Sequence, residues 1–180
     1  MTISSQLAIF NTLIATGTVV VCLFAVLYTF VPKIRPHISK TLVDWVLSIA
    51  SIGLILGPSI YQYYFGFPVC TMCWYQRIFM WPIGLMVLGT QFWGDNTGRR
   101  YVLSAIKWLA PAGLVFSIFH YVSQLGLTST EALCTAGAAV SCDGIDVIVW
   151  GFMTIPMMAG IGFISLFLLL NTYSKTLKVS

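Results

Sequence analysis

Two pairs of cysteines and one arginine could carry redox chemistry in this chain. Cys70 and Cys73 form a Cys-Thr-Met-Cys motif where a long apolar segment begins, and Cys134 and Cys142 lie in the longest polar loop. Arg77 follows Cys73 by four residues, so on a helix it lies one turn further along the same face. Two dithiols, a cation and apolar segments together indicate an electron relay between thiols outside a membrane and a compound dissolved in it.

The Cys70–Cys73 motif is expected at a helix N-terminus, because Pro68 just before it suits the first turn of a helix. At that position the helix dipole favours a thiolate and lowers the pKa of a cysteine. The alternatives are a plain disulfide or half of a zinc site. Arg77 also has a non-functional alternative, in which its side chain snorkels to the lipid headgroups. Beside Cys73, we favour a role in stabilising negative charge on the thiolate and on a reduced electron acceptor.

The second pair, Cys134 and Cys142, encloses seven residues that mostly have small side chains. A disulfide in so short a ring stabilises a fold only to a limited extent, which favours exchange with a soluble partner over a purely structural role. A zinc site built from all four cysteines is not expected, because sixty residues separate the pairs and thiolate zinc sites are usually compact knuckles. We therefore predict no metal.

Several other residues inside the apolar segments have a predicted structural or functional role. His120 is either a buried, hydrogen-bonded histidine or a proton donor that contacts a ligand. Cys22 lies alone in its segment and is expected to be a small packing residue. Gly53 and Gly57 form a Gly-x-x-x-Gly pair, which indicates close helix packing. Three prolines are expected to kink the segments that contain them: Pro82, Pro111 and Pro156.

The elements that must position these side chains are membrane helices. Of the 180 residues, 58% are hydrophobic and 8% are charged, whereas soluble domains carry about 25% charged residues. About 20 apolar residues cross the hydrocarbon core as a helix. The net charge of +4 is thinly spread, so no nucleic acid partner is expected. The sequence predicts an all-α polytopic membrane protein with five spans, at about Leu7–Val31, Leu42–Phe65, Cys73–Trp93, Val102–Leu125 and Val149–Asn171.

The basic residues predict the orientation of these spans in the bilayer. The first span is expected to be retained, because its apolar run is too long for a signal peptide and lacks a basic region before it. Eight of the nine Lys and Arg residues fall on one side of a five-span chain, which the positive-inside rule assigns to the cytoplasm. The N-terminus and both cysteine pairs are then extracytoplasmic, where disulfides persist. Arg77 is the exception, and an intramembrane cation is a functional candidate.

Two stretches of the chain resemble a known family. The motif Cys70-Thr-Met-Cys-Trp-Tyr-Gln-Arg77-Ile-Phe-Met-Trp-Pro82 resembles the signature of the DsbB family of membrane disulfide-bond-formation proteins. Cys142, followed by Trp150-Gly-Phe-Met-Thr-Ile-Pro156, resembles the last span of that family. The short gap between Cys134 and Cys142 is more similar to the Gram-positive BdbC branch. The resemblance covers roughly residues 42–172.

The resemblance implies a four-helix transmembrane bundle that reoxidises a DsbA-like thioredoxin-fold oxidant and passes two electrons to a quinone, ubiquinone or menaquinone. It also implies disulfides Cys70–Cys73 and Cys134–Cys142. By motif position, Cys73 faces the quinone with Arg77, and Cys70 exchanges with the loop pair. Cys134 forms the mixed disulfide with the partner, and Cys142 resolves it. We add His120 to the expected quinone contacts.

The same resemblance divides the chain and leaves alternatives open. Residues 1–41 are an extra N-terminal transmembrane helix with a basic cytoplasmic loop, residues 42–172 are the bundle with two extracytoplasmic dithiol loops, and residues 173–180 are a cytoplasmic tail. The expected location is a bacterial cytoplasmic (inner) membrane. One alternative is a relative of vitamin K epoxide reductase, although there the loop pair precedes the Cys-x-x-Cys. The other is a non-enzymatic membrane subunit with two structural disulfides.

Overall fold

The computed structural model describes all residues except 1, 94, 129–141, 143, 146 and 178–180. The elements in chain order are α1 (Ile3–Phe30), a short 3-10 helix η1 (Arg35–His37), α2 (Lys40–Tyr63), α3 (Thr71–Thr90), α4 (Asn96–Ile106), α5 (Leu109–Gln124), β1 (Ile148–Val149), β2 (Met153–Thr154) and α7 (Ile155–Thr176). The expected all-α membrane fold is confirmed. Cys134 lies outside the described residues.

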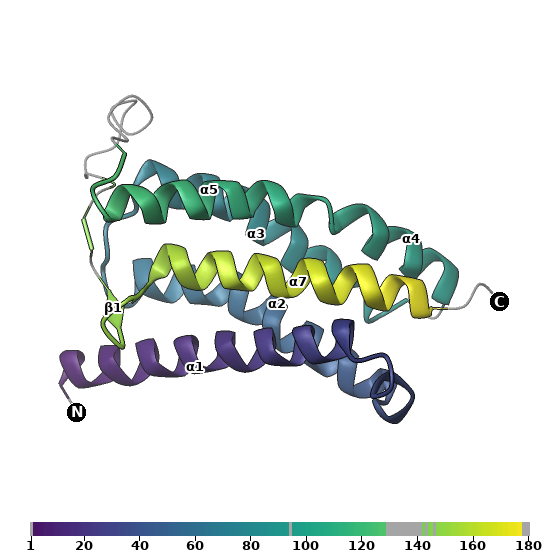
Figure 1. Cartoon of the computed structure of the whole chain (residues 1–180). Helices are drawn as coiled ribbons and strands as arrows, with labels where there is room; N and C mark the ends of the chain where they lie inside the picture. The colour runs from purple at the N-terminus through teal and green to yellow at the C-terminus, as the bar shows by residue number, and fades with distance from the viewer. Residues whose placement is uncertain (1, 94, 129–141, 143, 146, 178–180) are drawn as a thin grey trace.

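The helices run side by side along one long axis, with α7 between α1 and α5 and with α2 and α3 behind it (Figure 1). α7 is the central helix, since 56% of its most apolar stretch is buried, compared with 17% for α1. Its buried side chains Phe163, Leu166 and Leu169 lie in the main apolar core. α1 is therefore a peripheral helix that packs mainly along α7.

Four helical segments of the described chain are long and apolar enough to cross a membrane, namely α1, α2, the α4–α5 rod and α7. α3 is not in this set, because polar side chains such as Gln76 and Arg77 lower its mean hydropathy. Its 20 residues still span about 30 Å, which is the thickness of the hydrocarbon core. A fifth crossing by α3 therefore stays a prediction.

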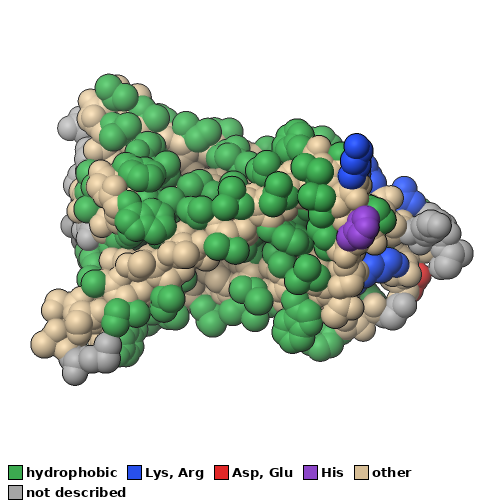
Figure 2. All heavy atoms as spheres, turned by 60° about the horizontal axis from the view of Figure 1, so that its bottom comes forward, with side chains coloured by type: hydrophobic (Ala, Val, Ile, Leu, Met, Phe, Trp, Pro, Cys, Tyr) green, Lys and Arg blue, Asp and Glu red, His purple; other side chains and the backbone are tan. Residues whose placement is uncertain are grey.

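The two ends of the bundle differ in charge. Figure 2 shows an apolar flank along the length of the molecule, with Lys and Arg side chains only toward one end of this face. At that end Arg99 of α4 forms a salt bridge with Asp44 of α2, and the Tyr173 hydroxyl of α7 donates to the same carboxylate at 2.7 Å. Arg35 donates to the carbonyls of Tyr28 and Thr29 at the end of α1. The contacts of Asp44 join α2, α4 and α7 at the charged end, and Arg35 caps the end of α1.

The three prolines that were expected to kink a span differ in their outcome. Pro111 lies in the first turn of α5, and the rod breaks at Lys107 and Trp108, because proline cannot donate to the carbonyl four residues earlier. Pro82 lies within a continuous α3. Pro156 lies in the first turn of α7, so it starts this helix instead of kinking it.

The last span also begins six residues later than expected, because Ile148–Thr154 form a small antiparallel hairpin. Trp150 and Gly151 turn the chain with φ values of 53° and 80°. Val149 and Met153 are buried in an apolar cluster with Tyr61 of α2. The hairpin therefore closes the end of the bundle opposite the cations.

Candidate functional site

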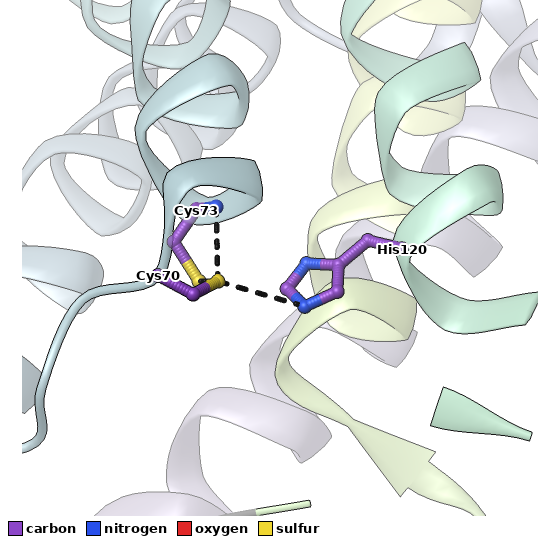
Figure 3. Close-up of side chains that lie close together, drawn as sticks. All are labelled: Cys70, Cys73 and His120. Atoms are coloured by element: carbon purple, nitrogen blue, oxygen red, sulfur yellow. Dashed lines mark hydrogen bonds between the residues drawn. The ribbon is translucent and has the colours of Figure 1, made fainter. Parts of the chain in front are cut away.

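Cys70 and Cys73 lie at the N-terminus of α3, as expected. Cys70 is the N-cap residue, and its Sγ accepts a hydrogen bond from the backbone N–H of Cys73 at 3.3 Å. The two Sγ atoms are 3.0 Å apart and both residues are thiols, so this is the reduced form of the pair (Figure 3). The Cys70–Cys73 disulfide of the oxidised form stays a prediction.

The surroundings of Cys70 stabilise its thiolate. The hydrogen bond from the Cys73 thiol is the main reason that the pKa of Cys70 is lowered, and nearby His120 contributes further. Burial opposes the shift, since Cys70 is 5% exposed. A lowered thiol pKa marks a cysteine that is ready to attack a disulfide. In the reduced pair Cys70 is therefore the more reactive thiolate, and in exchange with another cysteine pair it is the better leaving group.

His120 projects from α5 toward this dithiol (Figure 3). Its Nε2 atom is 3.8 Å from the Cys70 Sγ, and its side chain is buried. The buried Nδ1 atom has no hydrogen-bond partner among the described residues. The expected quinone contact of His120 stays a prediction, but in the structure its nearest chemistry is the Cys70 thiol.

Cys142 lies beside the dithiol and lines the same small cavity as His120. It is buried and disulfide-bonded, and it packs in one apolar cluster with Cys70 and Met72. The expected pairing with Cys134 concerns a residue outside the described chain and stays a prediction. A small cavity of about 30 Å³ is lined by Cys70, Cys73, His120 and Cys142, among others. The structure thus brings a cysteine of the loop pair beside the Cys-x-x-Cys motif.

Arg77 is buried inside the bundle and does not reach outward to the headgroups. Its guanidinium donates to Gln62 Oε1 and, at 2.9 Å, to the carbonyl of Pro58, both in α2. The guanidinium also lies 5.1 Å from the ring centre of Trp74 and 6.0 Å from that of Trp81. Its buried Nε–H has no partner among the described residues. An arginine held this way by neutral groups keeps its positive charge available to an anion.

A large apolar cavity of about 460 Å³ opens beside Arg77 and Cys73. Its walls come from α1, α2, α3 and α7, and its polar lining includes Gln62, Gln76 and Arg77. Tyr61 and Phe67, two of the aromatic residues near this end, also line it. Ligand sites commonly combine an apolar wall with a few placed polar groups. Cys73 lines both this cavity and the small one that contains Cys142.

A quinone fits this donor set. The unpartnered Arg77 Nε–H and the Gln62 amide are hydrogen-bonding groups at one end of an otherwise apolar space, which matches a polar ring that carries an apolar tail. Cys22 is not part of this site. It is a half-buried thiol on α1 and lines neither cavity. Gly53 and Gly57 line the large cavity, and a Cβ at either would meet no atom within 4 Å, so the expected close packing there is wrong.

Sequence reasoning missed several contributors to this site. Gln62 and the Pro58 carbonyl hold Arg77 but precede it by 15 and 19 residues, so no local motif links them. Ser117 of α5 fixes Gln76 through a 3.2 Å hydrogen bond. The polar side chain of Gln62 near the end of an apolar run was the signal that could have indicated a buried role.

A metal ion is a further possibility that the geometry itself raises. The Sγ atoms of Cys70 and Cys73 and a ring nitrogen of His120 all lie within 4.8 Å of one another. Structural zinc sites take four ligands. Cys142, which shares the small cavity, is disulfide-bonded and is not a thiolate donor in this state. The redox use of the pair therefore accounts better for this arrangement.

Comparisons with known proteins point to one family. A family model described as "Disulfide bond formation protein DsbB" matches residues 40–173. The chain is 33% identical to a "Probable disulfide formation protein" of Deinococcus radiodurans over 135 residues, covering 71% of this chain and 83% of the relative. It is 35% identical to "Disulfide bond formation protein C" of Bacillus subtilis, covering 67% and 82%. No solved structure matches the chain.

Proposed function

The chain belongs to the DsbB family of disulfide bond formation proteins, and from this premise we propose that it is a protein-dithiol:quinone oxidoreductase. The partner dithiol is oxidised to a disulfide, and its two electrons pass through the cysteine pairs of this protein. A bound quinone supplies the final acceptor, taking up two electrons and two protons to become the quinol. The relay from DsbA through DsbB to quinone is a known way in which a bacterial periplasm is kept oxidising.

The position of Cys73 between the two cavities is the observation that carries this proposal. On one side Cys73 borders the small cavity with Cys70 and Cys142, where one cysteine pair can exchange with the other. On the other side it borders the large apolar cavity beside Arg77. A cysteine with access to both spaces can receive electrons as part of a dithiol and deliver them to an apolar acceptor.

Arg77 is proposed to bind the quinone and to stabilise the negative charge that develops during reduction. Its hydrogen bonds to Gln62 and Pro58 fix the guanidinium without neutralising it. The free Nε–H is a donor for a quinone oxygen. In a low-dielectric site, an oriented charge of this kind acts strongly on an anion and needs no reorganisation.

His120 is proposed to act on the thiols. Thiol–disulfide exchange needs a thiolate to attack and a proton for the thiolate that leaves. A buried imidazole 3.8 Å from Cys70 Sγ is close enough to hold that proton after a small side-chain movement. His120, Cys70 and Cys142 all line the small cavity, which supports this role.

The partner and the location follow from the same chemistry. We propose a DsbA-like thioredoxin-fold oxidant as the electron donor, which forms a mixed disulfide with Cys134 that Cys142 resolves. The family and the apolar helices make this a multi-pass membrane protein. The bacterial cytoplasmic (inner) membrane, with both cysteine pairs on the extracytoplasmic side, is the location that this partner requires.

The test is a reconstituted relay. Purified protein in detergent is mixed with a reduced thioredoxin-fold oxidant and a quinone, and the quinone absorbance is followed over time. We expect catalytic loss of quinone together with stoichiometric oxidation of the partner. The Cys73→Ala variant should abolish quinone loss. If wild-type protein leaves the quinone oxidised although its cysteines are intact, the cysteine pairs are structural and the proposal is wrong.

A further inference from the structure

α1 lies outside the region that the family model matches, which begins at residue 40. It nevertheless forms one wall of the large cavity beside Cys73 and Arg77. Six of its residues line the cavity: Leu13, Ile14, Gly17, Thr18, Val20 and Val21. The extra helix therefore contributes to the shape of the site where the acceptor is proposed to bind.

The cavity is much longer than a single ring requires. Along α2 its lining extends from Val46 to Gln62, which is about 24 Å at about 1.5 Å per residue. This is most of the roughly 30 Å thickness of the hydrocarbon core. The polar groups Gln62 and Arg77 lie at one end, whereas the α2 lining from Val46 to Leu54 is apolar except for glycine. The shape is a slot with a polar head and an apolar body.

Glycines keep the body of this slot open on both sides. Gly17 of α1 and Gly53 of α2 both line it and are both exposed, and an added Cβ would meet no atom within 4 Å at either position. A side chain at either glycine would project into the space between the two helices. The slot therefore opens laterally where α1 faces α2, toward the apolar surroundings of the bundle.

Contacts near both ends of the slot hold α1 against the bundle, so α1 is a fixed wall of the slot. Near one end the Tyr61 hydroxyl of α2 donates to Asn11 Oδ1 at 2.7 Å, and Phe10 packs against the same ring at 5.0 Å. Near the other end Thr29 of α1 lies 3.2 Å from the hydroxyl of Thr172 in α7. Between these anchors the helix borders the open space.

Building on the proposed function, we propose that α1 and the glycine face of α2 form a channel for the isoprenoid tail of the quinone. The ring then lies at Arg77 and Cys73, and the tail runs along the apolar body and leaves between Gly17 and Gly53. Arg77 and Cys73, where the ring is proposed to bind, line the same cavity as the apolar body. This continuity favours a quinone tail as the occupant over a phospholipid chain. α1 thereby determines how strongly the protein prefers tailed quinones.

The test compares binding of two quinones in the full-length protein without a thiol partner. Quenching of tryptophan fluorescence reports binding, since Trp74 and Trp81 flank Arg77. Gly17→Leu and Gly53→Leu fill the channel from opposite sides. Each should weaken the tailed quinone by roughly tenfold, as expected for a pocket that loses space for a few methylenes. Affinity for a quinone without a tail should stay unchanged.

The matched control is Leu23→Phe, which also adds volume on α1 but at a residue that is 58% exposed and outside the cavity lining. It should leave both affinities unchanged. A tailed quinone carrying a photoreactive group near the end of the tail should label peptides from residues 13–21 of wild-type protein. This second measurement does not depend on the folding of any variant.

The outcomes separate this inference from the function on which it rests. If wild-type protein binds neither quinone, the proposed function is wrong. If it binds both, but Gly17→Leu and Gly53→Leu weaken them equally or not at all and the label misses α1, only the tail channel is wrong. A phospholipid chain in the slot would produce this second pattern.

Discussion

At the level of the single residue, Arg77 contrasts with Arg99, because both are buried but their partners differ in charge. Arg99 forms a salt bridge with the Asp44 carboxylate. Arg77 instead is held by an amide and a carbonyl and is flanked by two indole rings. Neutral supports position a guanidinium without lowering its pull on an anion. We therefore expect Arg77 to bind a ligand.

Replacing Arg77 should weaken quinone binding and leave thiol exchange intact. A charge-assisted hydrogen bond contributes about 1.5–3 kcal/mol, so Arg77→Met should raise the quinone KM by roughly ten- to a hundredfold. Arg77→Lys should recover only part of this, because lysine lacks the planar fork. Steady-state quinone kinetics and a thermal unfolding curve measure both effects. An unchanged KM in a folded Arg77→Met variant would leave Arg77 with no role at the acceptor.

The lowered pKa of Cys70 should be visible in its alkylation. A thiol whose pKa is lowered remains a thiolate at pH values where an ordinary cysteine, with a pKa of about 8.5, is protonated. In the reduced protein Cys70 should therefore react with a small alkylating reagent faster than Cys73 at pH 6–7, as mapped by mass spectrometry. His120→Asn should raise the pKa of Cys70 and move its reactivity to higher pH.

Cys22 gives an internal reference in the same experiment, because it lies on α1 outside both cavities. Its labelling should not respond to the His120→Asn change. If Cys73 reacts before Cys70 in this pH range, the thiolate is on Cys73, and the assignment of the lowered pKa to Cys70 is wrong.

At the level of elements, the approach of α5 to α7 positions His120 against Cys70. Gly113 of α5 faces the ring of Phe163 in α7, and a Cβ at this glycine would lie 2.3 Å from the nearest ring atom. Real side chains do not approach so closely, so only glycine permits this crossing. About one turn further along α5, Ser117 reaches Gln76 of α3, and about two turns further, His120 reaches Cys70 at the N-cap of α3.

Gly113→Ala should therefore destabilise the protein by about 1–3 kcal/mol, since overpacking must move a ring or a helix. Gly89→Ala in α3 is the matched control, because a Cβ there meets no atom within 4 Å. It should be neutral or stabilising by up to about 1 kcal/mol, the helix-propensity difference between alanine and glycine. Unfolding midpoints in detergent measure the two changes. Equal midpoints would show that the α5–α7 contact is not tight.

The apolar runs predicted the helices because burial in a bilayer acts on every residue of a span. The run that ends at Leu125 predicted the rod that contains α5, and Pro111 located its break. The hairpin before α7 was missed, although Val147 and Val149 are buried on either side of exposed Ile148, an alternation too short to recognise. The hydrogen bonds from Arg77 to α2 and the approach of His120 to Cys70 depend on how helices distant in the sequence pack. Such contacts have no local signal in the sequence.

The whole molecule has one end with many cations and one end with the dithiols, which predicts its orientation. Eight of the nine Lys and Arg residues fall on one side of the predicted five-span chain, so we expect an extracytoplasmic N-terminus and a cytoplasmic C-terminus. A reporter that is active only in the cytoplasm should work when fused to the C-terminus. The same reporter inserted in the loop between α5 and β1 should be inactive. An active reporter in that loop would contradict both the topology and the proposed function.

The order of the two dithiols along the molecule predicts the route of electrons. Cys142 and Cys70 line the small cavity, whereas the large apolar cavity, where we propose that the quinone binds, is lined by Cys73 and Arg77. A reduced partner should attack Cys134 and release Cys142, which then resolves the adduct or attacks Cys70. In Cys142→Ala, Cys134 lacks the cysteine with which it would form a disulfide and remains a thiol. With the oxidised partner, the Cys134 thiolate should attack the partner's disulfide, release one partner thiolate and leave a partner–Cys134 adduct that reductant removes on a gel. Cys73→Ala should stop quinone reduction while the partner still reacts with the loop. If Cys142→Ala traps nothing, but Cys70→Ala or Cys73→Ala traps the partner through the remaining thiol, electrons enter at the helix and the loop pair is structural.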